Sequence, residues 1–384
     1  MLKIWQFMRT LSVNWPGIVL LLAFWVPVSP LTAQVKTDTL RLLFAGDVMG
    51  HAPQIASAQL TRDKKYDYEP CFQYVKPIVS SADLAIANLE LTLPGKPPYT
   101  GYPMFRSPDA LAEAIKNAGF DVLVTANNHS NDARGTGVIS TLRTLDRLKL
   151  SHTGTFTDAN ERDTRYPLIL SRNGFRLALL NYTYGTNGVP TDSPTIVNLI
   201  DKTRMAADLE KAKSQKPHYI IVFMHWGLEY QLTENAEQKD LAAFLVSNGA
   251  DLIIGSHPHV VQPVRQEHVY TPEGYDKNVV VVYSLGNYIS NQLKPHTDGG
   301  IMFEVELLKK EGAEKAETGK NGIIPVWRYI HKDPTGKTTY FVVPVARATA
   351  DPALIPNMAP EAKAAMLQFG TDLRKRIGYN EIRQ

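Results

Sequence analysis

The sequence predicts an α/β protein, in which short strands alternate with helices along most of the chain. Runs of aliphatic and β-branched residues recur at intervals, and the stretches between them carry apolar residues at helical spacing. The chain of 384 residues is 44% hydrophobic and 21% charged, a balance that allows a substantial buried core. Alternation of the two kinds of element is typical of sheets that lie in the middle and are covered by helices.

The expected strands are short and end in turn residues. Residues 166–171 and 175–181 are separated by Arg172-Asn173-Gly174, and Asn-Gly between two apolar runs predicts a tight hairpin. In contrast, residues 309–322 are rich in Lys, Glu and Gly and predict an exposed loop. Further strands are expected over residues 40–45, 82–87, 121–125, 219–224, 251–254, 279–283, 301–307, 323–329 and 338–343.

The expected helices begin and end at recognisable residues. Ser107 is a suitable N-cap for a helix over residues 108–118, and Gly249 is suited to end a helix over residues 237–248. Apolar residues at helical spacing predict the remaining helices over residues 136–148, 203–214 and 360–377.

The first 33 residues differ in character from the rest of the chain. Lys3 and Arg9 precede an apolar run over residues 17–28, and Ala33 offers a small residue at a cleavage position. This order is typical of a secretory signal peptide. The run is shorter than the roughly 20 apolar residues of a membrane-spanning helix, and an uncleaved N-terminal anchor is the alternative. Both interpretations predict an exported protein.

The net charge and the cysteine count limit the partners and the metal sites that the chain can have. The formal net charge is +3 and no polybasic run occurs, so nucleic acid is not expected as a partner. Cys71 is the only cysteine, which excludes an intramolecular disulfide and a cysteine-rich zinc site. Any metal ion must therefore be held by His, Asp, Glu and Asn side chains.

Metal-binding side chains follow one expected strand after another. In open α/β sheets the carboxyl ends of the strands form the binding edge, so these groups are expected to meet there. His257-Pro258-His259 is the most informative segment, because two histidines in a glycine-containing turn are costly to bury without partners. The groups that follow the strands are Asp47, Glu90, Asn128, His225, His257, His259 and Asn287.

Carboxylate, amide and imidazole groups are the ligands expected for a divalent ion. Two ions about 3.5–4 Å apart can share a bridging carboxylate, and His129 is then available as a general acid. Asp132 can orient the His129 imidazole, and Glu229 is a candidate acid/base. Arg106 and Asn287 are candidate substrate-binding residues, since a guanidinium can hold phosphate or carboxylate with two hydrogen bonds. Taken singly, each of these residues is also compatible with a turn or surface role.

The residues that carry chemistry lie in six ordered segments, namely Gly46-Asp47, Asn88-Leu89-Glu90, Asn127-Asn128-His129, His225-Trp226-Gly227, Gly255-Ser256-His257-Pro258-His259 and Ser284-Leu285-Gly286-Asn287. As an ordered set they resemble the CapA family of bacterial capsule and poly-γ-glutamate synthesis proteins. The capsule-synthesis (PGA-cap) domain of that family is similar to calcineurin-type metallophosphatases, and the resemblance extends over residues 40–291. It implies a four-layer αββα sandwich, with a CapA-like domain over residues 36–308 and a C-terminal extension, residues 309–384, packed on it.

The resemblance also implies roles for the ligands. Met49 stands where the phosphatase pattern has a histidine, His51 lies nearby but out of register, and Glu90 replaces an aspartate. These departures leave one ion and two ions as alternatives, and Mn, Zn, Fe and Mg fit the ligand types equally. By analogy, the implied sites are a first ion held by Asp47 and His259, a bridging Glu90, and a second ion held by Asn128, His225 and His257.

The expected function follows from the resemblance. It is that of an exported, metal-dependent hydrolase of capsule or poly-γ-glutamate biosynthesis, which uses a metal-activated hydroxide on an ester or amide-type bond. Expected partners are an anionic cell-surface polymer or its precursor and a membrane-bound polymer synthase complex, in the periplasm or at the cell surface. Two alternatives are a non-catalytic polymer-binding or complex subunit that retains the fold, and a generic periplasmic phosphodiesterase.

Overall fold

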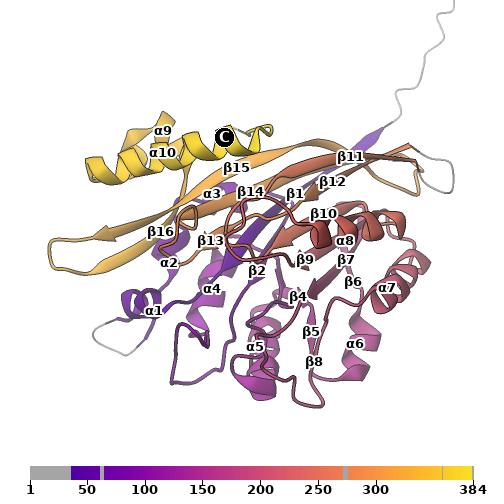
Figure 1. The fold of residues 1–384 in the computed structure, drawn as a ribbon, viewed down its shortest axis with the longest axis horizontal. Coiled ribbons are helices and arrows are strands. Elements are labelled where there is room, and N and C mark those ends of the chain that lie inside the picture. Colours follow the sequence, from indigo (N-terminus) through magenta and orange to yellow (C-terminus); the bar gives the residue numbers. More distant parts are fainter. Residues whose placement is uncertain (1–35, 61–64, 271–275, 357, 383–384) are drawn as a thin grey trace, which may run out of the picture. The chain divides into compact units, whose positions relative to one another are not determined.

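Two β-sheets face each other at the centre of the computed structural model, and helices cover their outer faces (Figure 1). The structure describes residues 36–60, 65–270, 276–356 and 358–382. The signal peptide or anchor predicted over residues 1–33 lies outside the described residues. Helices, sheet, sheet and helices follow one another as layers, which is the αββα sandwich that the resemblance implies.

The first sheet is centred on β1 (Thr37–Val48). On one side of β1 the neighbouring strands are parallel, and on the other side they are antiparallel. The order is β16 (Thr338–Pro344), β15 (Glu317–Lys332), β14 (Gly299–Lys310), β1, β2 (Leu84–Leu89), β3 (Val122–Val124) and β4 (Ser151–Thr153), and β13 (Asn287–Ile289) also pairs with β1.

The second sheet is parallel at its centre and antiparallel at both edges. Its order is β11 (Val264–Tyr270), β12 (Asp276–Val282), β10 (Leu252–Ser256), β9 (Tyr219–His225), β7 (Phe175–Thr183) and β6 (Leu168–Arg172). A separate antiparallel pair is formed by β5 (Thr155–Phe156) and β8 (Ile196–Val197).

Side chains of β1 alternate between two cores, as the period of two in a strand requires. Leu42 and Phe44 lie in the core between the sheets, together with Phe223 of β9. Leu43 and Ala45 lie in the core between the first sheet and its helices. Because both faces of the sheet are covered here, residues 42–45 are all apolar, and this is why the strand is recognisable in the sequence.

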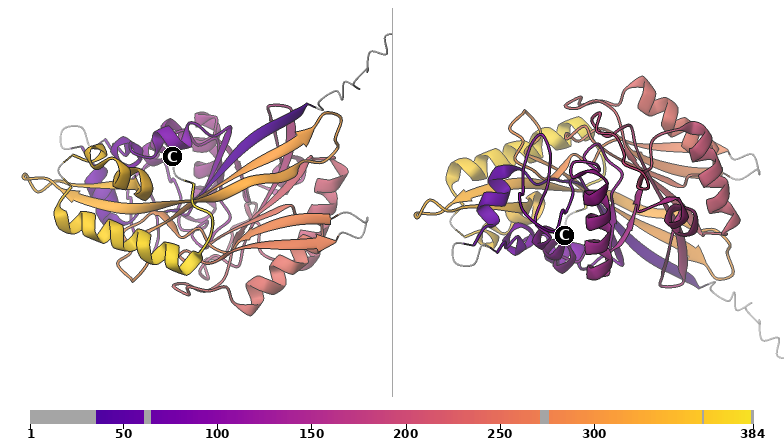
Figure 2. Two further views of the ribbon diagram at one scale, coloured as in Figure 1. Left: turned by 90° about the horizontal axis from the view of Figure 1, so that it is seen from above. Right: turned by 90° about the horizontal axis from the view of Figure 1, so that it is seen from below.

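Most helices that precede residue 250 pack on the outer faces of the two sheets, whereas the C-terminal helices pack on the core that joins the sheets (Figure 2). No helix within the described ranges is both long and apolar enough to cross a bilayer. The first sheet is covered by α1 (Ala52–Ala58), α2 (Glu69–Phe72), α3 (Lys76–Val79), α4 (Ala110–Asn117) and α5 (Arg134–Leu148), and the second by α7 (Lys202–Ser214) and α8 (Ala236–Ser247). The short helix α6 (Ala159–Arg165) contacts β5.

The C-terminal elements are α9 (Val345–Ala350), η1 (Pro352–Leu354) and α10 (Pro360–Ile377). Met366 and Phe369 of α10 belong to the same core that joins the two sheets, so this helix extends that core over β15. The predicted boundary between residues 308 and 309 lies inside β14.

Most sequence-based elements are confirmed, with two instructive errors. The hairpin is confirmed, because β6 and β7 are antiparallel and join at Asn173-Gly174. Ser107 is not the N-cap, since α4 begins after Asp109. The Asp109 side chain occupies the N-cap position but makes no capping hydrogen bond. The loop predicted over residues 309–322 is mostly strand, because β14 and β15 continue as a long hairpin whose end is exposed and therefore polar.

Strand pairing brings distant polar residues to one edge. Asp47 at the end of β1 is in register with Asn88 on one side and Asn287 on the other. The end of β1 approaches the backbone before β13 so closely that glycine is required at position 46, because a Cβ there would lie 2.0 Å from the backbone oxygen of Gly286.

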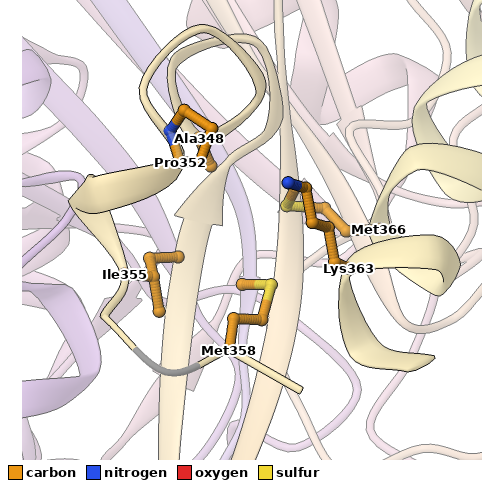
Figure 3. Close-up of a pocket in the computed structure, with 6 residues that line it drawn as sticks. All are labelled: Ala348, Pro352, Ile355, Met358, Lys363 and Met366. Carbon is orange, nitrogen blue, oxygen red and sulfur yellow. The ribbon is translucent and has the colours of Figure 1, made fainter. Parts of the chain in front are cut away.

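A small pocket lies between the C-terminal elements (Figure 3). Its volume is about 130 Å³, and no carboxylate or imidazole is found among the side chains described as lining it. It therefore lacks the groups expected of a catalytic site. The lining residues are Ala348, Pro352, Ile355, Met358, Lys363 and Met366.

Candidate metal centre

The strand edges bring the predicted ligands together in a buried cluster. The atoms of Glu90, His257 and His259 that could bind a metal ion all lie within 4.8 Å of one another. The same is true of the corresponding atoms of Asp47, Glu90 and His225. All five side chains are buried. The two groups share Glu90, which therefore lies at the centre of the cluster.

Glu90 is a carboxylate that lacks hydrogen-bond partners among the described residues. It is fully buried, and neither oxygen has a hydrogen-bond partner among the described residues. Its Oε1 lies 3.7 Å from Nε2 of His225 and 3.7 Å from Nε2 of His259. Two ligands at about 2.1 Å from one ion can be at most about 4.2 Å apart. Each 3.7 Å separation therefore leaves room for a cation bound by Glu90 Oε1 and the imidazole nitrogen opposite it.

Electrostatics favour a cation at this position. Burial, reinforced by the nearby Asp47 carboxylate, raises the pKa of Glu90 well above its ordinary value. Burial and the neighbouring imidazole of His257 lower the pKa of His225 well below its ordinary value, and burial and His259 lower the pKa of His257 to about 3. A divalent ion would offset the burial of the carboxylate, and neutral imidazoles are the form that binds metal. The residues present thus fit a divalent ion.

The turn that carries the two histidines is strained. His257 has φ 100° and His259 has φ 60°, in a region that L-residues rarely adopt. Such conformations cost about 1–3 kcal/mol each and are found mainly where a site requires them. Just before the turn, a Cβ at position 255 would lie 2.1 Å from the backbone oxygen of Tyr283, so glycine is needed there.

We call Asp47, His259 and Asn287 the first half of the centre. Asn88 Nδ2 donates to Asp47 Oδ1 at 2.8 Å. Nδ1 of His259 lies 3.1 Å from Asp47 Oδ2 and 3.2 Å from Asn287 Oδ1. Since both neighbours are acceptors, Nδ1 carries the proton and Nε2 presents its lone pair towards Glu90. A carboxylate in this position orients a metal-binding imidazole, and Asp47 already has protein partners.

We call Asn128, His225 and His257 the second half. Asn128 Oδ1 lies 2.9 Å from Nε2 of His225, and Nδ1 of the same ring lies 2.9 Å from Ser256 Oγ. Nδ1 of His257 is buried, with no hydrogen-bond partner in the part of the chain that the structure describes. Adjacent ligands of an octahedral ion with bonds of about 2.1 Å are about 3 Å apart. The Asn128–His225 spacing therefore suits two ligands of one ion.

His129 and Asp132 form a buried dyad beside the second half. Nδ1 of His129 lies 2.7 Å from Asp132 Oδ2, so Nδ1 donates, and Nε2 faces Asn187 Nδ2 at 3.5 Å. The Phe105 ring packs against the imidazole, with centroids 4.5 Å apart, and the Phe105 backbone N–H also donates to Asp132. Both contacts hold the imidazole in one orientation.

Met49 and His51 are not among the clustered ligands. Met49 is buried in the core between the first sheet and its helices. Nδ1 of His51 accepts from the Asn291 backbone N–H at 3.2 Å, and burial lowers the pKa of His51 to about 4. The histidine position of the phosphatase pattern is therefore filled by an apolar side chain.

Three other predicted site residues lie around the ligands. Arg106 is half-buried next to Phe105, and its Nε has no hydrogen-bond partner within the described ranges. Glu229 is exposed in the turn after β9. Asn287 Nδ2 donates to Gln292 and to a backbone oxygen, so its amide is used within the protein.

Sequence reasoning assigned no role to the residues that hold the ligands in place. Asn88 Nδ2 contacts Asp47 and, at 3.3 Å, Nδ1 of His225, so it touches both halves. Asn181 Oδ1 accepts from the Ala126 backbone N–H at 2.7 Å and fixes the start of the Asn128 loop. Both follow or end an expected strand, which is the signal that could have identified them.

Comparison with known proteins places these residues in a family. A model described as bacterial capsule synthesis protein PGA_cap matches residues 41–292, which include every ligand named above. The chain belongs to this family. The PGA_cap chain is 28% identical over 345 residues to the capsule biosynthesis protein CapA of Bacillus anthracis, covering 83% of this chain and 80% of that protein. It is also 28% identical over 335 residues to the PGA biosynthesis protein CapA of Bacillus subtilis (strain 168), covering 80% of this chain and 77% of that protein.

Solved structures similar to the PGA_cap chain include phosphoesterases. The calcineurin-like phosphoesterase YfkN from Bacillus subtilis aligns with a TM-score of 0.44 and 12% identity over 88% of this chain and 99% of that chain. The 5'-nucleotidase from Candida albicans SC5314 aligns with a TM-score of 0.41 and 11% identity over 89% of this chain and 59% of that chain. This PGA_cap protein has an αββα sandwich with a cluster of Asp, Glu and His side chains at one edge of its sheets.

Proposed function

We propose that this chain is an exported, metal-dependent hydrolase of capsule or poly-γ-glutamate biosynthesis, acting on an ester or amide-type bond. Family membership and the buried ligand cluster support the proposal. One observation carries it: Glu90 is fully buried, and its two oxygens lack any described hydrogen-bond partner. A carboxylate in that position is costly unless a cation compensates it.

Each side chain has a defined task in the proposed reaction. Glu90 and the two halves hold one or two divalent ions, which supply Lewis acidity and lower the pKa of a water molecule. His129 donates a proton from Nε2 to the leaving group. Asp132 holds Nδ1–H and stabilises the imidazolium until that transfer. Arg106 binds an anionic group that flanks the scissile bond.

Hydrolysis by the full chain loaded with Mn²⁺ tests this proposal. Bis-p-nitrophenyl phosphate reports cleavage of an ester, and γ-glutamyl-p-nitroanilide reports cleavage of an amide. We expect turnover of one probe and a loss of about 100-fold or more in kcat for His129→Ala, which is the usual contribution of a general acid. Wild-type turnover by His129→Ala, or no turnover of either probe by ion-loaded protein, would contradict a hydrolase.

The first half of the centre favours a second candidate, a non-catalytic subunit. Met49 fills the histidine position, and both oxygens of Asp47 already have protein partners. In that case the protein binds the anionic polymer or its precursor, or joins a membrane-bound synthase complex, and the ion is structural. Mn²⁺ binding without hydrolysis, together with retention of poly-γ-glutamate on immobilised protein, would support this candidate.

We also propose that the chain is exported to the periplasm or cell surface. The order of basic residues, an apolar run over residues 17–28 and Ala33 supports export. Amino-terminal sequencing of the protein from separated cell fractions tests it. A chain that begins after Ala33 indicates a cleaved signal, and an intact chain in the membrane fraction indicates an anchor. Recovery of the intact chain from the cytoplasm would contradict export.

A further inference from the structure

One loop beside the centre has no task in the proposed reaction. It covers residues 184–192, after β7. It is hydrogen-bonded to the loop over residues 125–133, which carries Asn128 and the His129–Asp132 dyad. Asn131 Nδ2 donates to Thr191 Oγ1 at 2.8 Å and to the backbone oxygen of Val189 at 3.3 Å. The two loops are therefore held together next to the second half.

Asn187 in this loop contacts two residues of the site. Its Oδ1 accepts from Asn128 Nδ2 at 3.3 Å and from the Tyr184 hydroxyl at 3.2 Å. Its Nδ2 lies 3.5 Å from Nε2 of His129. Asn187 itself is exposed and has φ 51°, a conformation that asparagine tolerates better than most residues.

The contact with Asn128 decides which amide atom faces the ion. Because Nδ2 of Asn128 is directed to Asn187, its Oδ1 is presented to His225. An amide turned the other way would present an NH₂ group, which is a donor and cannot bind a cation. Tyr184 supports this arrangement, since its hydroxyl bonds to Asn187 while its ring lies 4.5 Å from the His257 ring.

We propose that Asn187 is a positioning residue for the ion held by the second half, an inference that rests on the proposed metal centre. Its amide oxygen holds Asn128 with Oδ1 towards the ion. Tyr184 fixes the Asn187 side chain from the other side. Residues that orient metal ligands in this way usually change metal affinity by about 10–100-fold when they are replaced, and the exposed, single contact to Asn128 points to the lower end of that range.

Titration of the chelator-treated full chain with Mn²⁺ tests the inference, with free Mn²⁺ followed by electron paramagnetic resonance. We expect Asn187→Ala to raise the Kd of the tightest site about 10-fold. Asn187→Asp keeps the acceptor for Asn128 and is expected to stay within about 3-fold of wild type. Tyr184→Phe is expected to give a smaller increase than Asn187→Ala, since it removes only the hydroxyl that holds Asn187.

A matched control is Asn173→Ala. Asn173 is also exposed, also has positive φ (48°), and bonds to Asp83 at the β6–β7 hairpin instead of to the site. An equal loss of affinity in Asn173→Ala and Asn187→Ala would assign the effect to loop strain and overturn the inference. Wild-type affinity in Asn187→Ala would overturn it while leaving the metal centre intact. Absence of Mn²⁺ binding by the wild-type chain would reject both the centre and the inference.

Discussion

The two halves of the centre differ in how far the protein itself satisfies their polar atoms. In the first half, Asn88 and His259 already bond to the two oxygens of Asp47. In the second half, Asn128 Oδ1 lies 2.9 Å from Nε2 of His225, and Nδ1 of His257 is buried without a described partner. The second half therefore has a buried nitrogen that a cation could satisfy, whereas the protein already bonds both oxygens of Asp47 in the first half. We expect one tight ion and a weaker second one.

The largest expected effect is that of Glu90→Gln. Both halves share this carboxylate, so its loss removes the charge that balances either ion, and we expect Mn²⁺ affinity to fall by at least about 100-fold. Metal content and Mn²⁺ titration measure it. Glu229→Gln removes an exposed carboxylate from the rim and serves as the control with near-wild-type affinity. Tight binding by Glu90→Gln would show that the halves do not share a carboxylate.

Single changes in each half separate the two sites. Asn128→Ala removes a ligand of the second half, and we expect the tight Kd to rise by about 10–100-fold. Asp47→Asn disturbs the orientation of His259 and the bond from Asn88, so the weak ion is expected to be lost while the tight Kd changes by less than about 5-fold. Mn²⁺ titration to two equivalents resolves both sites. The reverse ranking would exchange the roles of the two halves.

The metal-free protein is expected to lose stability on acidification. The lowered pKa values of His51, His225 and His257 mean that these groups gain protons between pH 6.5 and about 4 in the unfolded chain but not in the folded one. The raised pKa of Glu90 acts oppositely, because the folded form keeps a proton that the unfolded chain loses above about pH 4.5. Three groups act against one, so we expect the free energy of unfolding to be lower at pH 5 than at pH 6.5.

Urea unfolding in the presence of a chelator at the two pH values measures this difference. Glu90→Gln removes the opposing group, so its pH dependence is expected to be steeper than that of the wild type. A free energy of unfolding that rises on acidification would contradict the assignment of neutral imidazoles to the folded centre.

The smallest expected effect on metal binding is that of Met49→His, which restores the residue of the phosphatase pattern. Met49 is buried in the core under the first sheet, so an imidazole there is expected to cost about 2 kcal/mol without creating a ligand. Met49→Leu keeps the apolar volume and controls for packing. Urea unfolding gives the cost and Mn²⁺ titration gives the number of ions. Tight binding of a second ion by Met49→His would show that the first half lacks only this ligand.

How much of the fold was predictable depended on local signals. The strand over 40–45 was recognisable because both of its faces are buried, and the β6–β7 hairpin because Asn173-Gly174 is a local turn signal. The hairpin of β14 and β15 was missed over residues 309–322, because its exposed end has the composition of a loop. Composition reports exposure directly and backbone pairing only indirectly.

By itself, the sequence determined the ligand types, their order along the chain and their position after strands. Tertiary structure decided which atoms meet, because the partners are far apart in the chain: Asn88 is 41 residues from Asp47 and 137 from His225, yet it touches both. It also decided that Asp47 is satisfied by the protein while Glu90 is not. That difference depends on which neighbours reach each buried oxygen, a property that no local pattern contains.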